Sequence, residues 1–182
     1  ALMTLLTGGK VVAMQVTVER GGEVLSQGGN RFLTLSAGYL GSLLIGALLL
    51  VSAAHSRHDR AILAALSLAM ALATILFMRE AFGLGYGIAM ALILLGIARF
   101  LPAAASDSVL RLIGVMSLLY VPRDIFSDTI ERSHLRSDAY MLAEEFGGST
   151  WLWGGIWLLI SLVICWYAVR ITLRAPGPAR GA

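Results

Sequence analysis

Four carboxylates are concentrated in one polar stretch, YVPRDIFSDTIERSHLRSDAY, which covers residues 120–140. The whole chain has only eleven acidic residues, and four of them lie here: Asp124, Asp128, Glu131 and Asp138. On a helix, the side chains at spacings of four, four and three share one face, which here carries Tyr120, Asp124, Asp128 and Glu131. Two carboxylates one helical turn apart could hold a divalent cation or pass a proton.

Asp124 follows the apolar run GVMSLLYV almost directly. An ionisable group at membrane depth costs roughly 2.5–3.5 kcal/mol on insertion scales and usually faces a partner or a cavity. Alternatively, Arg123 and Asp124 only mark the point where a helix leaves the bilayer.

For Asp138, the simpler interpretation is a helix cap. Either Ser137 or Asp138 is the predicted N-cap of an amphipathic helix with the apolar stripe Ala139, Leu142, Ala143 and Phe146.

The composition places these acids in a membrane protein. The 182 residues are 58% hydrophobic and 14% charged, whereas about a quarter of a soluble domain is charged. Mean hydropathy is +0.80. Apolar runs of about twenty residues predict membrane helices. Five are expected, at 33–53, 61–78, 82–101, 108–127 and 151–170. The basic residues are scattered between them, which argues against a nucleic-acid partner and leaves the lipid bilayer as the expected environment.

Small residues recur at helical spacing within the predicted spans. Close approach of helix backbones is the expected role of such rows. The rows are Gly38–Ser42–Gly46, Gly83–Gly87 and Gly154–Gly155.

The first thirty residues have a different pattern. ALMTLLTGG predicts a short helical segment that ends at Gly8–Gly9, either an interfacial helix or the end of a longer one that begins upstream. KVVAMQVTVE then alternates apolar and polar residues, and EVLSQ follows after a glycine turn, which predicts a β-hairpin at the membrane interface. The expected fold is an all-α integral, multi-pass membrane protein with a short N-terminal hairpin. The predicted divisions are 1–9, 10–30, 33–171 with a polar segment at about 128–150, and a tail at 172–182.

Several stretches in this order resemble the membrane-embedded zinc metallopeptidases related to site-2 protease, in particular their small peptidase-like branch. These stretches are LLTGGKV, AGYLGSLLIGALLL, YVPRDIFSDTI and SDAYMLAEEFGGSTWLWGGIWLLIS. The resemblance implies intramembrane proteolysis by a zinc-dependent hydrolase that cleaves membrane-associated proteins. In that family an H-E-x-x-H helix supplies two histidine ligands and a glutamate base, and a later membrane helix supplies an acidic ligand.

This sequence contains no H-E-x-x-H. We therefore expect it to be the C-terminal part of such a peptidase, cut just after that helix, with no catalytic residue in the chain itself. The resemblance implies that the zinc ligand is Asp124, with Asp128 the second candidate and Asp138 the third. It also implies that the hairpin of residues 10–27 pairs with an extended substrate.

Two other functions stay open at this point. One is a non-catalytic membrane scaffold of the same family. The other is a small transporter or proton pathway in which Asp124 and Asp128 titrate. An internal repeat would favour a transporter, and none is visible among the predicted spans.

Overall fold

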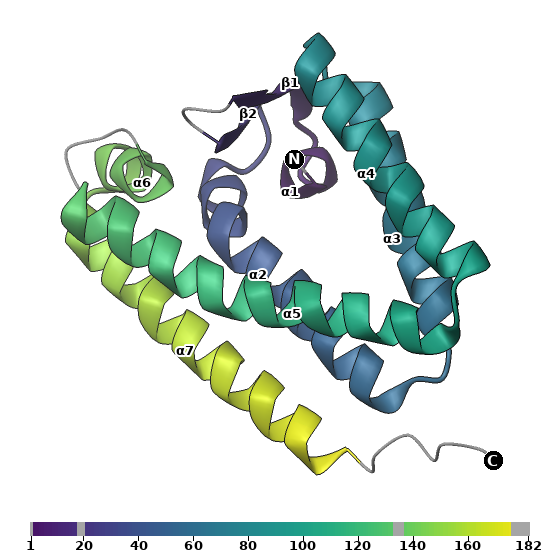
Figure 1. Ribbon diagram of the computed structural model, residues 1–182. Coiled ribbons are helices and arrows are strands. Elements are labelled where there is room, and N and C mark those ends of the chain that lie inside the picture. The colour runs from purple at the N-terminus through teal and green to yellow at the C-terminus, as the bar shows by residue number, and fades with distance from the viewer. Residues whose placement is uncertain (1, 18–20, 133–136, 176–182) are drawn as a thin grey trace. The chain divides into compact units, whose positions relative to one another are not determined.

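The computed structural model describes residues 2–17, 21–132 and 137–175, and it confirms the predicted fold class (Figure 1). In these ranges, five long apolar helices can each cross a membrane. They are α2 (Arg31–His55), α3 (Asp59–Phe77), α4 (Ala81–Phe100), α5 (Ala103–Phe126) with its continuation η1 (Ser127–Glu131), and α7 (Thr150–Arg174). The shorter elements are α1 (Leu2–Leu6), β1 (Lys10–Thr17), β2 (Gly21–Gln27) and α6 (Asp138–Phe146). The protein is therefore an integral, multi-pass membrane protein.

The chain folds into two compact units. The first contains residues 1–31 and 58–109, and the second contains residues 32–57 and 110–182.

The predicted fourth span, 108–127, is shorter than the observed helix, which runs from Ala103 through Glu131. The predicted spans leave residues 102–107 as a connection, but the helix already begins at Ala103. Pro102 lacks an N–H and directly precedes the first helical turn, where a missing donor costs little.

In the first unit, the predicted hairpin is confirmed. β1 and β2 are antiparallel, with Met14 opposite Val24, and the register slips between Val11 and Ala13. On its other edge, β1 forms a parallel bridge from Met14 to Met78, which lies between α3 and α4. Gly8 ends α1 with φ of +82°, a conformation that glycine adopts without steric cost.

The helices α3 and α4 pack against each other along a row of small residues (Figure 1). A Cβ at Gly87 would overlap the side chain of Thr74, so these two helices depend on the missing side chain for their close approach. Ser67 is buried in the same contact, and its hydroxyl donates a hydrogen bond to the Ala91 carbonyl at 2.7 Å. This confirms the packing role predicted for Gly87.

In the second unit, residues of α2, α5, α6 and α7 form one hydrophobic core, with Leu43, Ile125, Leu142 and Trp157 almost fully buried. Glycines again set the helix contacts. Gly46 of α2 leaves room for Ser117 of α5, and Gly154 of α7 leaves room for the buried Thr129 of η1. A Cβ at either position would overlap those side chains.

Gly154 and Gly155 offer a matched test of this packing. We expect Gly154→Ala to destabilise the protein by about 1–3 kcal/mol, because the new methyl group would meet the β-branched, buried side chain of Thr129. Gly155→Ala should be neutral, because no atom lies within 4 Å of the added Cβ. Thermal unfolding in detergent micelles measures both. Equal effects of the two substitutions would contradict the packing.

Candidate functional site

The segment that carries Asp124 and Asp128 begins at a proline. Pro122 lies inside α5 and has no N–H to donate, so the carbonyl of Leu118, four residues earlier, loses its helical partner. The thiol of Cys165, on α7, donates to this carbonyl at 3.4 Å. A backbone group in a membrane span must find a partner within the protein. The Cys165 thiol supplies it.

Past the proline, α5 changes into the π-helical turn η1. The amide of Arg132 donates to the carbonyl of Ser127, five residues earlier, at 2.9 Å. Such turns often occur at functional sites because they shift the side chains of a helix to a different face. Thr129 fixes this turn from within: its buried hydroxyl donates to the Ile125 carbonyl at 2.5 Å, and its side chain packs on Gly154. Asp128 is thereby directed towards α2.

Asp128 is held by two hydrogen bonds. The hydroxyl of Tyr39, on α2, donates to its Oδ2 at 2.6 Å, and the guanidinium of Arg132 donates to its Oδ1 at 2.6 Å. The Tyr39 ring lies beside the buried Trp157 of α7, with ring centroids 5.5 Å apart. The carboxylate is part of a network that joins α2, η1 and α7.

Asp138 reaches the same part of α2 from a different element. The predicted N-cap of α6 is confirmed as Ser137, whose Oγ accepts a hydrogen bond from the Tyr140 amide at 3.2 Å. Asp138 is therefore not the cap. Its Oδ2 lies against Gly38, and a Cβ at that position would overlap the oxygen. The row Gly38–Ser42–Gly46 thus has two roles: Gly46 allows helix packing, whereas Gly38 makes room for a carboxylate.

Asp124 differs from the other two acids. It lies one turn before Asp128 on an exposed face of α5, and within the described ranges its carboxylate makes no hydrogen bond. Its charge interacts with those of Asp128, Arg132 and Arg123. The structure places Asp128 and Asp138 against neighbouring residues of α2, Tyr39 and Gly38, and Asp124 lies one turn before Asp128.

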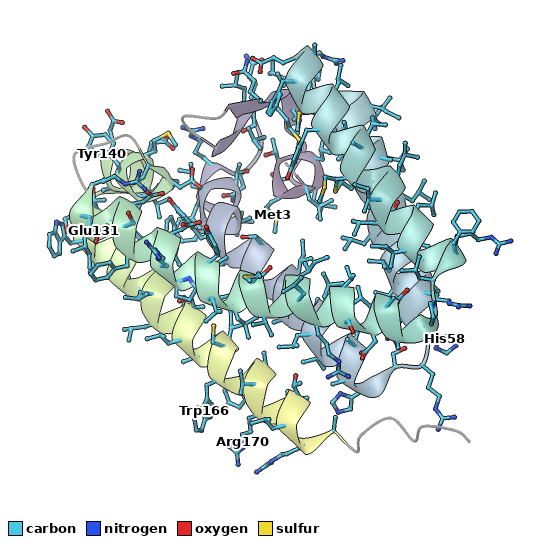
Figure 2. All side chains as sticks on the ribbon, in the orientation of Figure 1. Met3, His58, Glu131, Tyr140, Trp166 and Arg170 are labelled. Atoms are coloured by element: carbon cyan, nitrogen blue, oxygen red, sulfur yellow. The ribbon has the colours of Figure 1, made fainter. Side chains whose placement is uncertain are left out.

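The acids lie at one end of the second unit. Figure 2 shows Glu131 and Tyr140 at that end, whereas Trp166 and Arg170 lie towards the opposite end of α7. Sequence reasoning did not identify Tyr39 or Gly38 as partners of these acids. The available signal was weak: a tyrosine hydroxyl and a glycine next to each other in an apolar span.

Metal-ligand geometry is only partly present in this chain. Among the side chains that the structure describes, no three His, Cys, Asp or Glu residues are grouped as a metal site. His134, in the polar segment, is outside the described ranges. The described residues therefore provide carboxylates, without histidines beside them.

The fold and the site together define a class: a membrane protein with five spans in its described residues, a β-hairpin, and carboxylates on its fourth span and on α6 that lie against its first span. The family described as Peptidase M50B-like matches residues 1–168, and the chain belongs to this family of site-2-protease-related membrane peptidases. No curated protein and no solved structure gives a significant match.

The bond from Cys165 to Leu118 predicts different effects for two substitutions of the same thiol. Cys165→Ala leaves the Leu118 carbonyl without its donor and should destabilise the protein by about 1 kcal/mol. Cys165→Ser keeps a donor and should have a smaller effect. Thermal unfolding in detergent measures both. If the serine variant is no more stable than the alanine variant, the thiol does not serve as the partner of this carbonyl.

Proposed function

We propose that this chain is the part of an intramembrane zinc peptidase that supplies the acidic metal ligand and the substrate-binding hairpin. The observation that carries the proposal is the placement of Asp128 and Asp138 against Tyr39 and Gly38 of α2, with Asp124 one turn before Asp128, in a chain of the Peptidase M50B-like family. Membrane-associated proteins are the proposed substrates.

One carboxylate of this chain would fit as the acidic ligand of a zinc site with two histidines and one carboxylate. Zinc accepts carboxylate oxygens together with imidazole nitrogens, and catalytic zinc sites keep one position open for water. Asp124 is the proposed ligand, since its exposed carboxylate makes no other hydrogen bond within the described ranges. Asp128 and Asp138 are the second and third candidates. When bound, zinc would polarise a water molecule and make it a nucleophile near neutral pH.

The other ligands must come from elsewhere. The 182 residues contain no H-E-x-x-H, so both histidines and the glutamate base have to be supplied by polypeptide outside them. The chain's own contribution is to orient its carboxylates and to add negative charge beside the cation. Asp128 keeps a fixed place one turn from Asp124, because Tyr39 and Arg132 hold its two oxygens.

The hairpin supports a role in substrate binding. β1 has neighbours on both edges, β2 on one side and Met78 on the other. Within the described residues, the outer edge of β2 has no strand partner. An open edge of this kind can pair with an extended peptide, and a peptidase needs its substrate in an extended form.

A second candidate is a non-catalytic scaffold of the same family. A proton pathway through Asp124 and Asp128 is the third. Metal content and proteolysis of the full protein distinguish the peptidase from both alternatives, because neither a scaffold nor a proton pathway requires bound metal or proteolysis.

Substitution of the acids tests the zinc proposal. In the full protein, Asp124→Asn should reduce proteolysis by more than about 100-fold and reduce bound zinc, because the amide oxygen is a poorer ligand. Expression and thermal stability should stay near those of the wild type. The control is Glu144→Gln, an exposed acid on α6, which should change neither zinc nor activity.

Full activity in Asp124→Asn would remove Asp124 from the metal site. The same assay on Asp128→Asn and Asp138→Asn would then identify the ligand among the remaining candidates.

Proline substitution tests the open edge of β2. The amides of consecutive strand residues point to opposite edges, so Val24→Pro and Leu25→Pro remove one donor each, one facing β1 and one facing outwards. The variant that loses the outward-facing amide should keep its thermal stability. Its KM should rise about fivefold, which corresponds to the loss of one backbone hydrogen bond of about 1 kcal/mol to the substrate. Unchanged KM in both variants, with the protein folded, would exclude this edge as the substrate site.

A further inference from the structure

Tyr39 is a polar side chain on the membrane helix α2. It is separated from Asp128 by 89 residues in the chain, yet its hydroxyl donates to the Oδ2 of that carboxylate at 2.6 Å. A hydrogen bond to a charged acceptor is shorter and stronger than a neutral one, and at membrane depth few alternative partners compete for it.

Two further contacts restrict how this pair can move. Trp157 lies against the Tyr39 ring and is only 2% exposed, which limits the rotation of the tyrosine. Arg132 holds the other oxygen of Asp128 from one turn along η1. The Arg132 side chain is about half exposed, so its ion pair alone fixes the carboxylate weakly. The tyrosine is the better-ordered partner.

Gly38 precedes Tyr39 and contacts the second carboxylate. Successive residues of a helix point about 100° apart, so Gly38 and Tyr39 face different neighbours, α6 and η1 respectively. One turn of α2 therefore sets the position of acids from two separate elements.

We propose that Tyr39 is the positioning residue of the acidic site: its hydroxyl fixes the Asp128 carboxylate and so sets the arrangement of the charges around Asp124. This inference rests on the proposed zinc peptidase function. Hydrogen bonds that orient the groups around a metal typically change metal affinity or activity by about 10–100-fold when they are removed.

The test is Tyr39→Phe in the full protein, which removes one oxygen and keeps the ring on Trp157. We expect the zinc dissociation constant, measured by competition with a chelator, to rise about 10–100-fold. At saturating zinc, kcat per bound zinc should fall with KM unchanged. The control is Tyr167→Phe, the same chemical change at an exposed position of α7, which should alter neither quantity.

A purely structural role for Tyr39 would lower the folded fraction and leave kcat per bound zinc at the wild-type value. That result would overturn the proposal, as would an unchanged zinc dissociation constant in Tyr39→Phe.

A thermal double-mutant cycle separates this inference from the proposed function. If the hydroxyl acts through Asp128, the double variant Tyr39→Phe/Asp128→Ala should unfold at the temperature of Asp128→Ala alone. Additive effects would overturn the inference whether or not the protein binds metal. A wild-type protein that binds no zinc would overturn the proposed function, and the cycle would still decide whether Tyr39 positions Asp128.

Discussion

Polar groups within a membrane span need partners inside the protein, because lipid offers none. This constraint explains the contacts around the acidic site. Pro122 removes a donor from α5, and the Cys165 thiol replaces it at the Leu118 carbonyl. The following turn directs Asp128 towards α2, where Tyr39 donates to it. Each of these polar contacts joins α5 or η1 to a neighbouring helix. The hydrogen bonds that place the acids therefore also contribute to helix packing in the second unit.

Helix α2 contributes most to this arrangement, although it carries no acidic residue. Gly38 leaves space for Asp138, Tyr39 holds Asp128, and Gly46 allows α5 to approach closely. A helix with Gly38 and Tyr39 on one turn can fix the place of two carboxylates that belong to different elements. An incoming metal would then meet charges already in position, and their arrangement would not have to be ordered on binding.

The elements could be predicted from the sequence, because hydropathy over twenty residues and period-two alternation are local signals. The five spans, the hairpin and the Ser137 cap were all predictable on that basis. The partners of the acids were not. The contact from Tyr39 to Asp128 joins residues 89 apart and depends on a π-helical turn, which no spacing rule indicates. From the sequence, Gly38 was interpreted as part of a row of small residues that allows helix packing. Only the tertiary structure shows that a carboxylate lies beside it.

The most direct test of the central claim is X-ray absorption at the zinc edge of the full protein, purified without added metal. The account predicts about one zinc per chain, bound by nitrogen and oxygen ligands at roughly 2.0–2.2 Å, with imidazole scattering from two histidines. The oxygen contribution should diminish in Asp124→Asn. A protein that contains no zinc, or zinc bound without a carboxylate, would contradict the assignment of the acidic ligand to this chain.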